Sequence, residues 1–132
     1  MSYEIDICCH VSGNDFSPNK AEKLIELKFE NKIEVGDLIL IGKFKDTLSI
    51  IGSASLSPFS NQDKFSDDYL INFIELLSEN IDILKSCGVQ NFDLSLGIFY
   101  KDQCNFSFSS QIIKLLNQTG LTLNISCFQI EN

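Results

Sequence analysis

Residues 66–100 read SDDYLINFIELLSENIDILKSCGVQNFDLSLGIFY and carry the clearest secondary-structure signal of the chain. The first half of this stretch repeats apolar side chains at steps of three and four, which is the period of an amphipathic helix: Leu70, Phe73, Ile74, Leu77, Ile81 and Leu84. Residues 91–100 instead alternate apolar and polar side chains, as a half-buried strand does. The stretch therefore predicts a long helix after Ser66, ending before Gly88, and then a strand.

Upstream, residues 3–12 alternate in the same way and predict an opening strand. The dipeptide Ser17-Pro18 has the order of an N-cap and a first helical residue, so we expect a helix over residues 18–29. Residues 33–57 contain short apolar runs and predict two antiparallel strands, with Lys45-Asp46-Thr47 as the turn between them.

Downstream of a polar surface loop expected over residues 57–65, the long helix and its strand lead to a third helix. Ser107 or Ser109 is expected to cap that helix and Gly120 to end it, before a closing strand over residues 121–127. The predicted order is β-α-β-β-α-β-α-β. Strands that alternate favour the α+β class, with a single, mostly antiparallel sheet, helices on one face, and a ferredoxin-like arrangement or a relative of it.

The composition limits the classes of partner. At 132 residues the chain is expected to form one domain, residues 1–132. Its 18 acids face ten lysines and no arginine, for a net charge of -8 and a pI near 4.4. Nucleic-acid binding is disfavoured, because it depends on clustered lysine and arginine. A basic partner is favoured instead.

Compartment is also indicated by composition. The first residues carry acids where a signal peptide is basic, and no apolar run approaches the roughly 18 residues of a membrane span, so we expect a soluble, cytoplasmic protein. Frequent isoleucine, serine and asparagine, with lysine but no arginine, suggest an AT-rich coding sequence and hence a bacterium. Five cysteines form no C-x-x-C pair and are expected to be free, buried thiols: Cys8, Cys9, Cys87, Cys104 and Cys127.

Few residues offer catalytic or metal chemistry. His10 shares a strand face with Cys8 and Asp6, which are the residue types of an activated cysteine nucleophile. A zinc site could use Cys8 or Cys9 with His10, joined by Cys127 if the last strand lies beside the first. We favour the simpler interpretation, in which Cys8 packs as a small apolar residue and His10 lies on the sheet surface. No catalytic residue, cofactor or metal is therefore expected.

The negative charge is concentrated on the predicted long helix. Residues 65–84 hold five acids and no base, or -5 of the net -8: Asp67, Asp68, Glu75, Glu79 and Asp82. At about 100° per residue, the last four lie within about 60° of one another, opposite the apolar stripe. Like charges at this spacing cost roughly 0.2 to 0.5 kcal/mol each. We therefore interpret the five acids as partner-binding residues; an acidic face that serves solubility alone is the alternative.

The two ends of the chain resemble a known family. The first strand running into VSGNDFSP (residues 11–18), and the ending FSFS (106–109), a short helix and TGLTLNISCF (119–128), are similar to small bacterial domains of unknown function. Some of these domains are grouped with immunity proteins of polymorphic toxins and of contact-dependent growth inhibition. The resemblance implies a protein that neutralises a toxin, and it supplies no functional residues.

Together these features predict an immunity protein, not an enzyme, that binds a basic toxin domain through its acidic helix. A nuclease is one candidate partner, because nuclease active sites are basic and an acidic face can occupy them. Two alternatives stay open. One is a small enzyme that depends on cysteine or carboxylate chemistry, and the other is a scaffold or homo-oligomer subunit that uses an apolar patch or a sheet edge.

Overall fold

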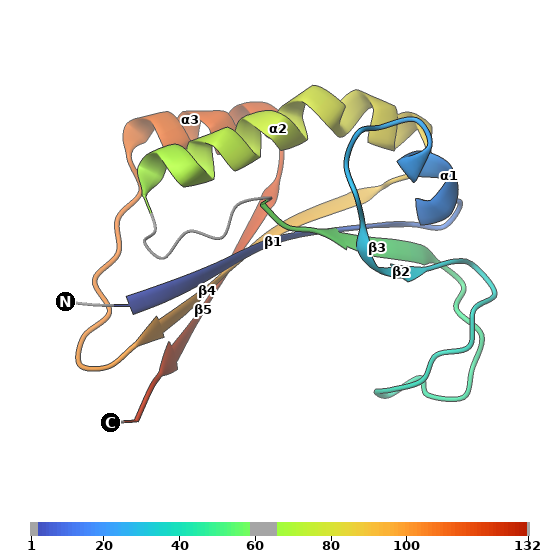
Figure 1. The fold of residues 1–132 in the computed structure, drawn as a ribbon, viewed down its shortest axis with the longest axis horizontal. Coiled ribbons are helices and arrows are strands. Elements are labelled where there is room, and N and C mark those ends of the chain that lie inside the picture. The colour runs from blue at the N-terminus through green and yellow to red at the C-terminus, as the bar shows by residue number, and fades with distance from the viewer. Residues whose placement is uncertain (1–2, 59–65, 132) are drawn as a thin grey trace. The chain divides into compact units, whose positions relative to one another are not determined.

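The computed structural model describes residues 3–58 and 66–131, so most of the loop predicted over residues 57–65 lies outside the described residues (Figure 1). Three helices and five strands in this part of the chain follow the predicted order. They are β1 (Tyr3–Gly13), α1 (Pro18–Glu22), β2 (Glu30–Ile33), β3 (Gly52–Leu56), α2 (Asp67–Ser86), β4 (Asn91–Tyr100), α3 (Ser110–Thr119) and β5 (Thr122–Gln129). The α+β class is confirmed.

The strands form one mixed sheet in the order β2-β3-β1-β4-β5. β2 and β3 are antiparallel, whereas β4 and β5 are parallel from Asp93 and Thr122 to Tyr100 and Gln129. A parallel pair needs a crossover of about a dozen residues or more, and α3 lies in that crossover. The expectation of a mostly antiparallel sheet therefore holds only loosely. The first six elements have the element order of the ferredoxin-like motif, and α3 and β5 extend it.

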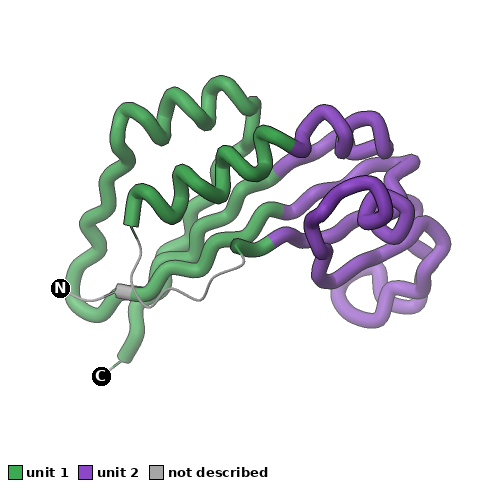
Figure 2. Tube along the Cα trace, turned by 45° about the horizontal axis from the view of Figure 1, so that its top comes forward, with its two compact units in different colours: residues 1–9, 57–79, 93–132 green, residues 10–56, 80–92 purple. Residues whose placement is uncertain are grey.

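The chain divides into two compact units (Figure 2). The first unit contains residues 1–9, 57–79 and 93–132, and the second contains residues 10–56 and 80–92. β1, α2 and β4 each contribute residues to both units. The expectation of a single domain stays a prediction.

In the first unit, α2 and α3 lie on the same side of the strands (Figures 1 and 2). The alternation of β4 is reproduced, because Leu94, Leu96 and Ile98 are buried while the residues between them are partly exposed. The helices contribute further buried side chains to this unit, namely Leu70, Phe73, Ile74 and Leu77 of α2 and Ile112 of α3. Each buried side chain of this size stabilises the fold by about 1.5 to 3 kcal/mol.

The helix ends follow the predicted capping chemistry. Ser17 is the N-cap of α1, and Pro18 is its first residue. Of the two candidate serines for α3, the cap is Ser109, whose Oγ accepts the backbone N–H of Ile112 at 3.3 Å. Gly120 then ends α3 in the left-handed region, with φ of 70°.

α1 is shorter than predicted, because it ends at Glu22 and does not continue to residue 29. Beyond its end, Ile25, Leu27 and Phe29 are buried at every second position, while Leu24 is 65% exposed. The backbone turns and bends over residues 23–26 and forms neither helix nor strand over residues 27–29. Ile25, Leu27 and Phe29 are therefore buried without a longer helix.

The predicted strand pair over residues 33–57 is only partly right. Of the regular strands, β3 lies inside this range, whereas β2 enters it only with Ile33. Between them, residues 34–51 form two antiparallel legs that share one isolated bridge, Leu38 to Leu48; we call this segment the arm. Its legs are joined by backbone hydrogen bonds from Gly36 N to Ser49 O, Ser49 N to Asp37 O, Ile39 N to Thr47 O and Asp46 N to Ile39 O. Thr47, expected in the turn, therefore already belongs to the returning leg.

Two glycines of the second unit allow backbone segments to touch. A Cβ atom built on Gly13 would overlap the carbonyl oxygen of Gly88, and one built on Gly52 would overlap that of Phe16. The end of β1, the turn after α2 and the start of β3 therefore approach neighbouring backbone more closely than any side chain permits.

Alanine at Gly13 or Gly52 is expected to lower the free energy of unfolding by roughly 2 to 4 kcal/mol, because the backbone must move to relieve the overlap. Gly97→Ala in β4 is the matched control, since its Cβ would lie 3.6 Å from the nearest atom. Urea unfolding followed by circular dichroism measures all three variants. Equal losses at Gly97 and Gly13 would contradict the close-contact explanation.

Candidate functional site

The five acids predicted to bind a partner all lie on α2, and all are exposed: Asp67, Asp68, Glu75, Glu79 and Asp82. The residues of the opposite stripe are no more than 3% exposed: Leu70, Phe73, Leu77 and Leu84. Asp82 lies on the part of α2 that belongs to the second unit, and the other four acids belong to the first. The helix thus has buried apolar residues on one side and exposed carboxylates on the other.

No lysine neutralises these carboxylates in the part of the chain that the structure describes. Over residues 3–58 and 66–131 the one ion pair joins Lys32 of β2 to Glu22 of α1. Asp67 and Asp68 occupy the first turn, where the helix dipole favours negative charge. Glu75 and Glu79 have no such compensation, so their charge is available to a cation from outside.

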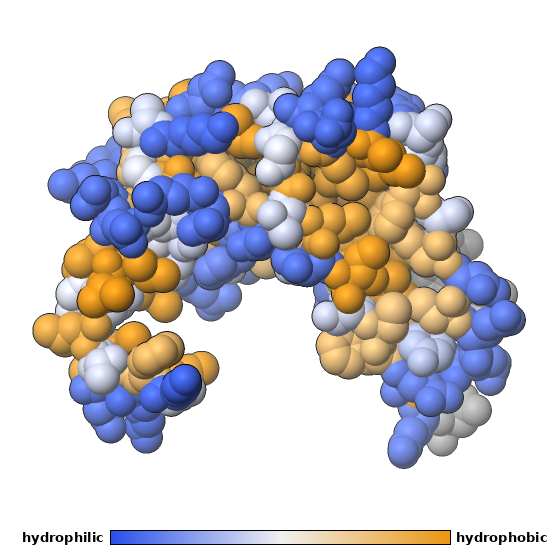
Figure 3. Space-filling model, turned by 180° about the vertical axis from the view of Figure 1, so that it is seen from behind, coloured by the Kyte–Doolittle hydropathy of each residue, from blue (hydrophilic) through white to orange (hydrophobic). Residues whose placement is uncertain are grey.

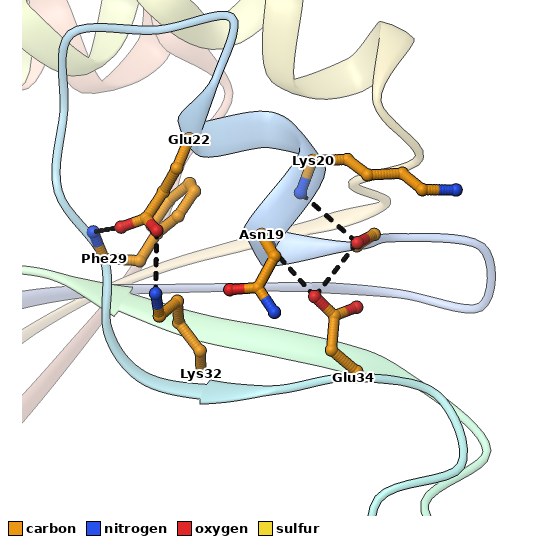
Figure 4. Close-up of polar contacts among 7 residues, drawn as sticks. Asn19, Lys20, Glu22, Phe29, Lys32 and Glu34 are labelled. Atoms are coloured by element: carbon orange, nitrogen blue, oxygen red, sulfur yellow. Dashed lines mark hydrogen bonds and ion pairs between the residues drawn. The ribbon is translucent and has the colours of Figure 1, made fainter.

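Glu22, in contrast, has a structural role (Figure 4). Its carboxylate accepts the backbone N–H of Phe29 at 2.7 Å and the ammonium group of Lys32 at 2.8 Å. The hydrogen bond from Lys32, followed by that from Phe29, holds the pKa of this carboxyl below its ordinary value of 4.5. Glu22 therefore ties α1 to the segment that leads into β2.

Glu34 ties the base of the arm to α1 in a similar way (Figure 4). Its Oε1 accepts the hydroxyl of Ser17 at 3.0 Å and the backbone N–H of Asn19 at 2.9 Å. The backbone N–H of Glu34 donates to Oδ2 of Asp37 at 2.8 Å. The carboxylates of Glu22 and Glu34 thus accept hydrogen bonds from within the chain. In this respect they differ from the five acids of α2.

The residues of the enzyme alternative lie on β1. His10 is exposed, and its Nδ1 lies 3.5 Å from Oγ of Ser55 on β3. Asp6 is exposed and Cys8 is partly exposed. Cys9 is fully buried, and burial raises the pKa of its thiol to about 12. Cys9 therefore stays protonated near neutral pH and offers no thiolate to a substrate or a metal.

The zinc site suggested by the sequence could use Cys127 only if the last strand lay beside the first. This condition is not met, because β4 separates β1 from β5 in the sheet. Cys127 is accordingly not beside the cysteines of β1. Within residues 3–58 and 66–131, no three or more histidine, cysteine or acidic side chains form a group that could hold a metal ion.

The expectation of buried thiols is also wrong for four of the five cysteines. Cys9 alone is buried, Cys8, Cys87 and Cys104 are partly exposed, and Cys127 is exposed. The exposure of Cys127 follows from the place of β5 as the edge strand of the sheet.

The sequence did not reveal the most exposed apolar surface, which is the arm. Of the fourteen large hydrophobic residues that are exposed within residues 3–58 and 66–131, eight lie there: Val35, Leu38, Leu40, Ile41, Phe44, Leu48, Ile50 and Ile51. In Figure 3 the arm is the lobe at the lower left, and hydrophobic side chains cover much of it. One feature of the sequence pointed to this surface. The runs at residues 38–41 and 48–51 do not alternate apolar and polar side chains fully, as a strand with one solvent-exposed face would.

Comparison with known proteins finds no relative: no known protein family, no curated protein and no solved structure matches this chain. None of the helices in the described ranges has the length and hydrophobicity that crossing a membrane requires.

Glu22→Gln is expected to lower the free energy of unfolding by roughly 1 kcal/mol near pH 7, because it removes a partly exposed ion pair and weakens a hydrogen bond. Since the folded-state pKa of Glu22 is lowered, its contribution is present above the ordinary value of 4.5 and is lost as the pH falls through the folded-state pKa. Urea unfolding from pH 7 to pH 3 should show wild type and variant converging at the acid end.

Glu79→Gln is the control for this measurement. It is expected to leave stability unchanged or to raise it by a few tenths of a kcal/mol, because it relieves repulsion on α2. A loss as large as that of Glu22→Gln would show that Glu79 has a structural role.

Proposed function

We propose that this protein is a bacterial immunity protein, which binds and neutralises a toxin domain in the cytoplasm through the acidic face of α2. The observation that supports this function is the set of five exposed carboxylates on one helix: Asp67, Asp68, Glu75, Glu79 and Asp82. None of them forms an ion pair with the described part of the chain. Inhibition by binding requires no catalytic residue, cofactor or metal.

The charge suits a basic partner. The helix window carries -5 of the net -8, and exposed charges act over a Debye length of about 8 to 10 Å at physiological salt. Complementary charge raises association rates by about 10- to 1,000-fold. A nuclease domain fits this proposal, because its substrate site must be cationic to hold phosphate and an acidic helix can occupy it.

The resemblance of the two ends of the chain to small bacterial domains grouped with immunity proteins also supports this proposal. It predicts that the gene upstream encodes a large toxin with a variable C-terminal domain. That C-terminal domain is the probe with which the proposal can be tested.

The triple variant Glu75→Lys, Glu79→Lys and Asp82→Lys is expected to weaken binding to that toxin domain at least tenfold, because attraction becomes repulsion. Titration calorimetry at two salt concentrations measures the effect. Wild-type affinity should fall as salt rises, and affinity of the variant should not.

The matched control carries the same change in net charge elsewhere, at three exposed acids whose side chains form no hydrogen bond or ion pair with the described residues: Glu26→Lys, Glu30→Lys and Asp102→Lys. This control should bind within about twofold of wild type. Unchanged toxin inhibition by the α2 variant, or equal weakening in both variants, would refute the assignment to this face.

The arm favours a second candidate function, that of a homo-oligomer subunit or scaffold. Ile41 is 84% exposed and Ile50 is 82% exposed, on legs that backbone hydrogen bonds already order. Exposed apolar patches of this kind mark protein contact sites, and burial of each side chain contributes about 1.5 to 3 kcal/mol. A second copy of the chain would supply a matching apolar surface.

Sedimentation over a concentration series tests this candidate. Wild type is expected to self-associate, and the double variant Ile41→Ser and Phe44→Ser to stay monomeric, because it removes apolar area from the tip of the arm. Leu24→Ser is the control, since Leu24 is 65% exposed but lies outside the arm. A monomeric wild type at every concentration would exclude self-association through the arm.

A further inference from the structure

Two cysteines meet in the first unit. Cys104 lies in the loop between β4 and α3, and Cys127 lies on β5. Their Sγ atoms are 3.7 Å apart, whereas the sulfur atoms of a disulfide are about 2.05 Å apart. The remaining gap of less than 2 Å is within the reach of side-chain rotation and small loop movement.

Hydrogen bonds close to the two cysteines hold their segments together. The N–H of Ile130 donates to the carbonyl of Tyr100 at 2.6 Å, and the side-chain amide of Gln129 donates to the carbonyl of Lys101 at 3.3 Å. The start of the loop is thus held to the end of β5, close in sequence to both cysteines. The approach of the sulfurs does not depend on their own weak hydrogen bond.

Exposure makes this pair accessible to small reagents. Cys127 is exposed and Cys104 is partly exposed, unlike the fully buried Cys9. Desolvation, followed by the hydrogen bond to Cys127, raises the pKa of Cys104. Cys127 is therefore the thiol placed for the first attack, and Cys104 is placed to resolve the product.

We propose that Cys104 and Cys127 form a reversible intramolecular disulfide when the protein meets a hydroperoxide. The Cys127 thiolate attacks the peroxide, which is reduced to an alcohol or water, and Cys127 becomes a sulfenic acid. The Cys104 sulfur then attacks the sulfenic sulfur, and its proton leaves with the displaced hydroxyl group as water. Two thiols are oxidised by two electrons in total, and one peroxide bond is reduced.

The bond joins residues 23 positions apart and encloses α3 and most of β5. It would fasten the edge strand of the sheet to the loop that precedes α3. A cross-link of this length restricts the unfolded chain, so oxidation is expected to raise Tm by about 5 to 10 °C.

The test treats the purified full-length protein with hydrogen peroxide and maps its cysteines under non-reducing conditions. Cleavage after lysine separates residues 102–114 from residues 115–132, which contain Cys104 and Cys127 respectively and no other cysteine. We expect these two peptides to be cross-linked, with the mass of two hydrogen atoms lost, and to separate again after reduction. The rate should not depend on protein concentration, because the reaction is intramolecular.

Variants identify the order of the steps. Cys104→Ser should accumulate a sulfenic acid on Cys127 that dimedone captures, and Cys127→Ser should abolish the cross-link. Cys87→Ser is the control, because Cys87 is partly exposed like Cys104 but lies just after α2. This variant should keep the cross-link. Cross-linking of other cysteine pairs in wild type, a concentration-dependent rate, or an unchanged Tm after oxidation would overturn the proposal. These readouts need no toxin, so they are independent of the proposed function.

Discussion

The close backbone contact between Gly13 and Gly88 is the constraint on which the second unit depends. The carbonyl oxygen of Gly88 occupies the space that a side chain at position 13 would need. Next to it, the N–H of Gln90 donates to the carbonyl of Ser12 at 2.8 Å. Gly88 has φ of 102°, a conformation that ends α2 and turns the chain toward β4. The contact therefore sets where β1 ends, where α2 ends and where β4 begins.

The position of α2 gives its acids their significance. With Leu77 and Leu84 buried, the carboxylates on the other side have water as their surroundings. Glu22 and Glu34 show what an acid with a structural role looks like in this protein, because each accepts two hydrogen bonds from elsewhere in the chain. An acid without such bonds adds repulsion to the fold, and a cationic partner would turn that repulsion into attraction.

The arm and the cysteine pair differ from the acids of α2, because they expose apolar side chains and a thiol, which a folded chain ordinarily buries. The arm keeps its shape through backbone hydrogen bonds while its apolar side chains face outward. Cys127 is exposed because β5 is the last strand of the sheet. Charge on α2, apolar area on the arm and thiols at the sheet edge thus provide three surfaces that separate substitutions can probe.

From the sequence alone come the element order, the length of α2, its two faces, the caps Ser17 and Gly120, and two candidates for the cap of α3, Ser107 and Ser109. These follow from periodicity and capping, which are local properties of neighbouring residues. Only the folded chain shows that α1 ends at Glu22, that the arm is exposed, that β4 and β5 are parallel and that Cys104 meets Cys127. Each of these depends on residues distant in sequence: Phe29 reaches back to Glu22, and the apolar runs of the arm lack a buried face because no other described element covers them.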